Sequence, residues 1–115
     1  MTENEIAWLA GFLEGEGTFG VRNRTTIYAA AVSTDLDVLE KVKRLCGSGC
    51  IYKTTKRKAH WKDAWVWTVT CRQARQIMTA ILPSMGIRRG NRIKSLLDEY
   101  EIRMKENMES AAAIA

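Results

Sequence analysis

The sequence predicts a single α+β domain in which helices cover one face of a four-stranded antiparallel sheet. Two observations predict it. The 115 residues suit one domain, and helical and strand periodicities alternate in the order αββαββα, followed by a further helix. Hydrophobic residues make up 46% of the chain and charged residues 27%, a balance typical of a packed protein. We expect residues 1–109 to form the domain and the Ala-rich residues 110–115 to fray.

The first helix is predicted to begin after Thr2 and to end near Gly15 to Gly17. Thr2 and Glu5 have the spacing of a capping box. Apolar residues then recur at helical spacing: Ile6, Leu9, Ala10 and Leu13.

A hairpin is predicted next, because residues 18–33 alternate as paired strands do around a turn at residues 23–26. In the first strand we expect Phe19 and Val21 in the core, with Arg22 and Arg24 on the opposite, outer face. In the return strand the expected core residues are Tyr28, Ala30 and Val32. The residues expected beside the arginines are then Ile27, Ala29 and Ala31.

The second αββ unit opens with a helix that Thr34 or Asp35 can cap and that Gly47 ends. Strands are predicted at residues 51–55 and 64–70, with a basic hairpin tip between them. In the latter strand we expect the side chains to alternate, with Trp65, Trp67 and Val69 inward and Val66 and Thr68 outward.

Two helices complete the predicted order. One covers residues 72–82 and is closed by Pro83, which cannot continue a helix. The other covers residues 91–108, where apolar residues return at helical spacing.

Charge and cysteine content narrow the function classes. Eighteen Lys and Arg against 13 Asp and Glu give a net charge of +5, which fits a polyanionic partner. No apolar run reaches the roughly 18 residues of a membrane span, and the first twenty residues hold four acids and no Lys or Arg, so we expect no secretory signal and no membrane. The 3 cysteines, an odd number, favour a reducing intracellular compartment. We expect a bacterial or phage-host cytoplasm rather than an organelle.

Small residues recur at every fourth position of the first helix, at Ala7, Gly11 and Gly15. Such a stripe lets another backbone approach closely. Glycine inside a helix costs about 1 kcal/mol relative to alanine. Close packing against a second helix would offset that cost.

Two acids, Glu14 and Glu16, lie at the C-terminal end of the same helix. The helix dipole disfavours anions there. A carboxylate in this place suits a bound cation, and Mg²⁺ takes carboxylate and carbonyl oxygens. A twofold axis along the small-residue stripe would bring two copies of Glu16 to one site.

The nine residues LAGFLEGEG, positions 9–17, resemble the LAGLIDADG motif of homing endonucleases, and Thr18 and Phe19 extend the likeness. The αββαββα order is that family's fold, over about residues 3–105. The resemblance implies that Glu16 binds the catalytic metal with the carbonyl of Gly15, the metal being Mg²⁺ or alternatively Mn²⁺. It also implies a homodimer held through the first helix, with these residues at the interface: Ala7, Ala10, Gly11 and Glu14.

The family also has a basic residue beside the active site, and Arg88 occupies the corresponding region, with Arg89 as the alternative. Since arginine keeps its proton, we expect Arg88 to clamp a phosphate or the transition state and not to act as a base. By the same resemblance, Thr34 and Asp35 lie where a polar residue commonly positions the attacking water.

The family reads DNA with the outer face of its sheet in the major groove. The residues that this resemblance assigns to DNA binding are Arg22, Arg24, Ile27, Ala29, Tyr52, Thr54, Lys56, Lys58, Val66 and Thr68. Arginine can bridge the two acceptors of guanine, and apolar side chains can touch a thymine methyl group. Lysines at the hairpin tip suit phosphates.

The resemblance therefore predicts a site-specific endonuclease that hydrolyses double-stranded DNA at a long, nearly palindromic site as a homodimer. Two alternatives stay open: a DNA-binding protein without cleavage, and a maturase that assists RNA splicing. Both would tolerate Glu16→Gln, whereas a nuclease would lose cleavage and keep binding.

Overall fold

The computed structural model describes residues 1–54 and 61–114. Within them the elements follow in the order α1 (Glu3–Glu16), β1 (Gly17–Arg22), β2 (Thr26–Ser33), α2 (Leu36–Cys46), β3 (Cys50–Lys53), β4 (Trp65–Thr70), α3 (Cys71–Ile81), the 3-10 helix η1 (Leu82–Ser84) and α4 (Ile87–Ile114). The predicted α+β class and element order are confirmed.

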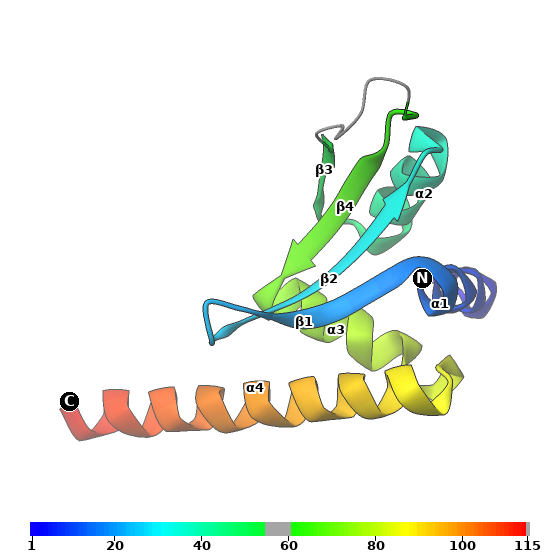
Figure 1. Ribbon diagram of the computed structural model, residues 1–115. Coiled ribbons are helices and arrows are strands. Elements are labelled where there is room, and N and C mark those ends of the chain that lie inside the picture. The colour runs from blue at the N-terminus through cyan, green and yellow to red at the C-terminus, as the bar shows by residue number, and fades with distance from the viewer. Residues whose placement is uncertain (55–60, 115) are drawn as a thin grey trace.

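The four strands form one antiparallel sheet in the order β1-β2-β4-β3. Helices α1, α2 and α3 pack on the sheet, and α4 contacts β1, α3 and η1. Figure 1 shows α4 running along the bottom of the domain and past the β1–β2 hairpin. The strand order leaves β1 and β3 as the sheet edges, and α4 lies beside β1.

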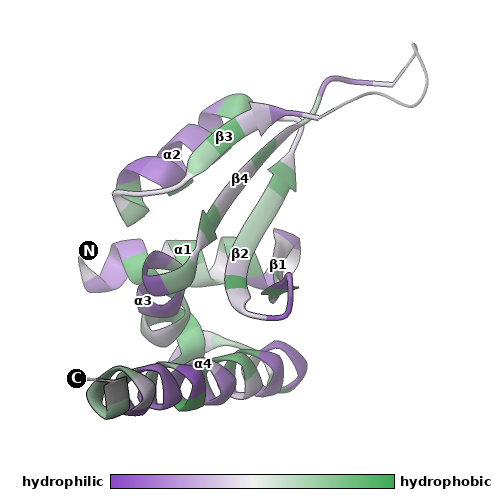
Figure 2. Cartoon of the chain, turned by 90° about the vertical axis from the view of Figure 1, so that its left-hand side faces the viewer, coloured by the Kyte–Doolittle hydropathy of each residue, from purple (hydrophilic) through white to green (hydrophobic). Residues whose placement is uncertain are grey.

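The core lies between the inner face of the sheet and these helices. Its sheet residues are Phe19, Ile27, Ala29, Ala31, Trp67 and Val69, and its fully buried helix residues include Leu9, Leu13, Leu39, Met78, Ile81, Ile93 and Leu96. Figure 2 shows mostly apolar colour along β2 and separate apolar segments along β4, and α4 likewise alternates between polar and apolar residues. In the part of the chain that the structure describes, no helix is both long and apolar enough to cross a membrane.

The capping box that begins α1 is present as predicted. The Glu5 amide donates to Thr2 Oγ1 at 3.1 Å, and the Thr2 amide donates to Glu5 Oε1 at 2.8 Å. The hydrogen bonds from Thr2 lower the pKa of Glu5, because they stabilise its charged form. Local sequence therefore sets where α1 begins.

The predicted facing of β2 is wrong. Directly opposite residues of an antiparallel pair share a face, and Phe19 pairs with Ala29 while Val21 pairs with Ile27. Ile27 and Ala29 are therefore core residues, each 0% exposed, and they cannot contact DNA as expected. The residues of β2 that lie on the outer face are instead Tyr28, Ala30 and Val32.

The physical reason is the length of the β1–β2 turn. A turn over residues 23–26 would pair Arg22 with Ile27, whereas the structure pairs Arg22 with Thr26. The Thr25 amide donates to the Arg22 carbonyl at 3.3 Å, and the two central residues, Asn23 and Arg24, have φ of 50° and 67°. Such a turn matches the twist of a hairpin, and a slip of one residue turns every side chain of the return strand over. Arg24 thus lies in the turn and not on the strand.

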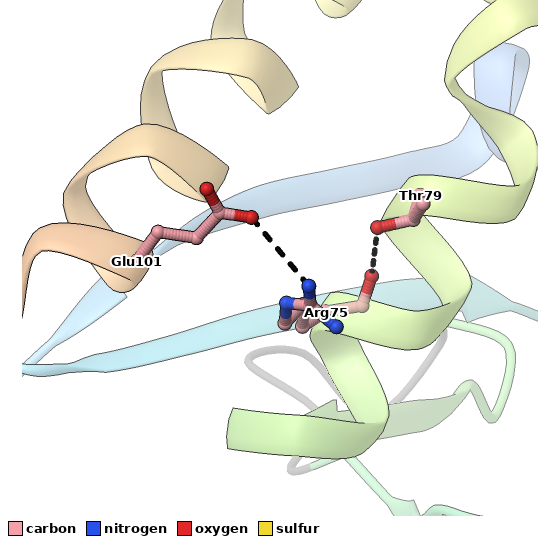
Figure 3. A network of polar contacts seen from close by, with 3 residues as sticks. All are labelled: Arg75, Thr79 and Glu101. Carbon is pink, nitrogen blue, oxygen red and sulfur yellow. Dashed lines mark hydrogen bonds and ion pairs between the residues drawn. The ribbon is translucent and has the colours of Figure 1, made fainter. Parts of the chain in front are cut away.

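Helix α4 is longer than the predicted 91–108, and β3 ends at Lys53 before the predicted residue 55. Among the described residues, two polar contacts tie the middle of α4 to α3 and to the β1–β2 turn. Arg75 Nη2 on α3 donates to Glu101 Oε1 at 3.5 Å, beside the bond from Thr79 Oγ1 to the Arg75 carbonyl (Figure 3). Arg103 Nη1 donates to the Thr25 carbonyl at 2.6 Å in the β1–β2 turn. The fraying of residues 110–115 stays a prediction.

Candidate metal and nucleic-acid site

Glu16 is the last residue of α1 and is exposed. The Gly17 amide closes the helix by donating to the Leu13 carbonyl, and β1 begins at Gly17 without a loop. A Cβ on Gly17 would lie 2.5 Å from the Leu13 carbonyl oxygen, so this direct passage from helix to strand needs glycine. The carboxylate of Glu16 is therefore held at a tight junction between α1 and β1.

Glu16 and Thr34, which the sequence predicts to act together, line the same surface hollow of about 630 Å³. Asp35 lines it too, and Ser33 Oγ accepts a hydrogen bond of 3.0 Å from the Asp35 amide at this corner. The hollow thus combines two carboxylates, of Glu16 and Asp35, with two hydroxyls, of Ser33 and Thr34. Such oxygen donors suit a hard divalent cation.

Metal ligands on a single copy are nevertheless few. In residues 1–54 and 61–114, no group of three or more His, Cys, Asp and Glu is placed to hold a metal ion. The carbonyl of Gly15 lies in the last turn of α1, where backbone oxygens have no partner within the helix. The oxygen donors of Glu16, Asp35 and the Gly15 carbonyl therefore fit a divalent metal ion in their chemistry.

Arg88 does not line the Glu16 hollow. It lies with Arg89 and Arg92 around a second hollow of about 400 Å³, whose opposite wall is Gly17, Thr18 and Phe19. The two hollows therefore flank the α1–β1 junction.

The three arginines of that second hollow have different tasks. Arg89 Nη1 donates to the Gly17 carbonyl, and Arg92 Nε donates to the Phe19 carbonyl at 3.4 Å. Both arginines thus cover the free edge of β1, a role that the sequence analysis missed. Arg88 is exposed and has no hydrogen-bond or ion-pair partner among the described residues. Of the two predicted alternatives, Arg88 is the one left free for an anion.

The small-residue stripe of α1 is open. Ala7, Gly11 and Gly15 are exposed, and, apart from neighbouring atoms of α1 itself, no atom of the described residues lies within 4 Å of where a Cβ on either glycine would stand. Ala10 is not part of this surface as predicted, because at 2% exposure it packs into the core of its own domain. The reason is helical geometry: at about 100° per residue, position 10 turns toward the buried side with Leu9 and Leu13.

Glu14 makes a contact within its own chain. Its Oε2 accepts a hydrogen bond of 3.1 Å from the Gly86 amide, which precedes α4. A Cβ on Gly86 would lie 2.9 Å from Glu14 Oε1. Glu14 therefore ties α1 to the start of α4, and its expected place at a dimer interface stays a prediction.

The outer face of the sheet is defined by the strand registers and comprises Thr18, Gly20, Arg22, Thr26, Tyr28, Ala30, Val32, Cys50, Tyr52, Val66, Thr68 and Thr70. Of the predicted DNA-contacting residues, Arg22, Tyr52, Val66 and Thr68 lie on it, although Val66 is only 9% exposed.

The remaining predicted DNA contacts lie elsewhere. Thr54 follows β3, and its Oγ1 donates to the Ala64 carbonyl at 3.2 Å. Arg24 is in the β1–β2 turn, and Lys56 and Lys58 lie outside the described residues.

A family model described as a LAGLIDADG-like domain matches residues 3–100. The chain belongs to the LAGLIDADG family. The match spans both αββ units and reaches into α4. No curated protein sequence matches the chain.

Solved structures of homing endonucleases have the same LAGLIDADG fold. An archaeal intron-encoded homing endonuclease complexed with DNA has a TM-score of 0.69 at 17% identity, over 86% of this chain and 68% of that chain. The homing endonuclease I-TnaI has a TM-score of 0.65 at 19% identity, over 88% of this chain and 74% of that chain. I-CvuI, in complex with its target in the presence of 2 mM Ca, has a TM-score of 0.64 at 16% identity, over 85% and 66%. The chain spans about two thirds of the length of most of these relatives.

Proposed function

We propose that this LAGLIDADG chain is a site-specific DNA endonuclease that works as a homodimer with a divalent metal ion. The observation that carries the proposal is the exposed Glu16 carboxylate at the end of a helix whose small-residue stripe is open. Similar solved homing endonucleases hold DNA, and one was crystallised with Mg.

The dimer follows from the stripe of Ala7, Gly11 and Gly15. Exposed glycines within a helix reduce its stability, and a second copy of α1 packed on them would recover that loss. Because Gly15 directly precedes Glu16, a twofold axis along the stripe brings the two Glu16 side chains near each other. The paired arrangement would add a second Glu16 to a site that holds no group of three His, Cys, Asp or Glu within the described residues of one copy.

The residues of the proposed site would divide metal binding, water positioning and phosphate binding among them. Glu16 and the Gly15 carbonyl would hold Mg²⁺ or Mn²⁺, which when bound supplies Lewis acidity and lowers the pKa of water. Thr34, in the same hollow, can orient the attacking water through its hydroxyl. Arg88, unpaired among the described residues, can bind the scissile phosphate and stabilise the charge that develops on it.

Binding would use the outer face of the sheet. Arg22 and Tyr52 project from it at its two edge strands. The net charge of +5 attracts the DNA backbone and makes the affinity depend on salt. Base contacts in the major groove then select the sequence.

The test incubates a randomised duplex DNA library with the native chain in Mg²⁺ and sequences both retained and cut molecules. Glu16→Gln should keep retention and lose at least about a hundredfold in cleavage, the scale of removing a charge-stabilising group from a catalytic site. Glu106→Gln, at an exposed position of α4, is the matched control and should cut normally. Cut ends flanked by a twofold-symmetric consensus support the proposal.

Retention without cutting by the native chain would replace the proposal with a silent DNA-binding protein, and retention of RNA alone would favour a maturase. The dimer is tested separately by light scattering. Gly11→Leu should shift the mass toward the monomer, whereas Ser95→Leu, which adds the same side chain on exposed α4, should not. A native chain that stays monomeric at all concentrations and with DNA would contradict the proposal.

A further inference from the structure

The outer face of the β1–β2 hairpin carries a stacked unit of three residues. Gly20 lies directly opposite Tyr28 in the strand register. A Cβ on Gly20 would lie 2.8 Å from the Tyr28 hydroxyl oxygen and 2.9 Å from two of its ring carbons. The tyrosine ring therefore occupies the space in which a side chain at position 20 would stand, and glycine in this strand permits that close approach.

Arg22 completes the unit. Its register partner is Thr26, so Tyr28 is its diagonal neighbour across the strands, within reach of long side chains. The Arg22 guanidinium carbon lies 4.3 Å from the centroid of the Tyr28 ring, in a cation–π contact. The backbone at Gly20 thus supports the ring, and the ring supports the guanidinium.

This support leaves the hydrogen-bonding edge of Arg22 available. A cation–π contact uses the face of the planar guanidinium, whereas its N–H donors point out along the edge. Arg22 itself is exposed, and no hydrogen bond or ion pair engages it within residues 1–54 and 61–114. A fork of parallel donors fits the O6 and N7 acceptors of guanine in the major groove.

We propose that Tyr28 is a positioning residue that makes Arg22 a selective reader of guanine, a role that rests on the proposed DNA-binding function. Arginine has one of the largest side-chain entropies, which is lost when the fork is fixed on a base. Tyr28 restricts the guanidinium before binding, so less freedom is lost at that step. The discrimination at this base therefore depends on the ring as well as on the arginine.

Arg24 of the same hairpin provides the contrast. It lies in the turn with φ of 67°, is exposed, and has no aromatic ring beneath it among the described residues. An unsupported arginine suits phosphates, which carry no sequence information. Arg22 should therefore affect which sequence is bound, and Arg24 only how tightly any duplex is bound.

The experiment selects retained molecules from the randomised duplex library with the native chain, Tyr28→Leu and Tyr28→Phe. The native chain should enrich guanine at one position of each half-site. Tyr28→Phe, which keeps the ring, should enrich it equally, and Tyr28→Leu should lose about two- to fivefold of that preference, the scale of an exposed cation–π contact. Arg22→Lys should lose it as well, whereas Arg24→Lys, the matched control, should weaken binding to all sequences alike.

A second measurement needs no DNA. In the native chain the Tyr28 ring current should shift the NMR signal of the Arg22 side-chain N–H. That shift should persist in Tyr28→Phe and disappear in Tyr28→Leu, or in Tyr28→Thr should the leucine variant not fold.

The outcomes separate the two proposals. A consensus that is selected equally strongly by Tyr28→Leu, or an unshifted Arg22 signal in the native chain, overturns the role of Tyr28 and leaves the endonuclease proposal standing. A native chain that retains no duplex overturns the endonuclease proposal, and the role of Tyr28 falls with it.

Discussion

The facing of β2 decides which residues can reach DNA, and a matched pair of substitutions tests it. Ile27 and Val32 are β-branched aliphatic residues of the same strand on opposite faces. Ile27 is 0% exposed in the core, whereas Val32 is 48% exposed on the outer face. Truncating each to alanine should therefore have very different effects on the free energy of unfolding.

Ile27→Ala removes buried methyl and methylene groups and leaves a cavity, so it should lower the free energy of unfolding by about 2–5 kcal/mol. Val32→Ala removes groups that are half in water, and its effect should stay within about 0.5 kcal/mol, as at other surface positions. The difference should be at least about 1.5 kcal/mol, which exceeds the error of a careful denaturation curve.

The assay is urea unfolding followed by tryptophan fluorescence, with all variants at one low protein concentration because dimerisation would add to stability. The midpoint should fall for Ile27→Ala with an unchanged slope, which indicates a stability effect and not a change in the denatured state. Equal losses, or a larger loss for Val32→Ala, would refute the register and return Ile27 to the outer face.

Three further predictions concern the groups around the site. Arg89→Met should lower the free energy of unfolding by about 1–3 kcal/mol, because it leaves the Gly17 carbonyl at the edge of β1 without its hydrogen-bond donor. Thermal or urea unfolding measures this loss. The control Arg88→Met, at an exposed position, should have little effect. Burial raises the pKa of the Cys46 thiol to about 11, so Cys46 should be alkylated far more slowly at pH 8 than the exposed Cys50. Mass spectrometry measures the two rates, and faster labelling of Cys46 would contradict its burial. Hydrogen bonds from Thr2 lower the pKa of Glu5, so the charged Glu5 side chain stabilises the fold above the ordinary glutamate pKa, and this stabilisation is lost as the pH falls through the lowered pKa. Unfolding curves of Glu5→Gln, measured at several pH values, should lack this loss of stability at acid pH. Identical pH profiles for the native chain and Glu5→Gln would argue against the capping box.

Because α1 passes directly into β1, the nine residues of the motif contribute both to the core of the domain and to its proposed site. The same helix supplies core residues on one side, an open backbone stripe on the other, and Glu16 at its end. Glu14, two residues earlier, is bonded to the Gly86 amide at the start of the segment that presents Arg88. A change in the packing of α1 would therefore move the acidic and the basic parts of the proposed site together.

Much of the fold could be predicted because it depends on local patterns. The capping box at Thr2 and Glu5 begins α1, and α3 ends just before Pro83. The other elements, predicted from their periodicities, appear in the structure in the predicted order. The motif at positions 9–17 led to the family, because its glycines and acids are unusual for a helix selected for stability alone.

Contacts between distant parts of the chain lay beyond those patterns. The guanidinium of Arg89 bonds to the Gly17 carbonyl across 72 positions, and periodicity along α4 does not identify a partner on another element. Likewise Ala10 fits either a helix interface or a core by its size, and its burial depends on how α1 packs against its own domain.

The facing of β2 depended on a single residue of turn length. Tyr28, Ala30 and Val32 alternate with Ile27, Ala29 and Ala31, and both sets are apolar enough for a core. Hydrophobic pattern therefore could not choose between them, although Asn23 is a residue that accepts the left-handed conformation of a tight hairpin turn. Pairing with β1 and β4 settled the choice, because strand partners must share a face, and it placed Tyr28 beside Arg22 on the surface proposed to read DNA.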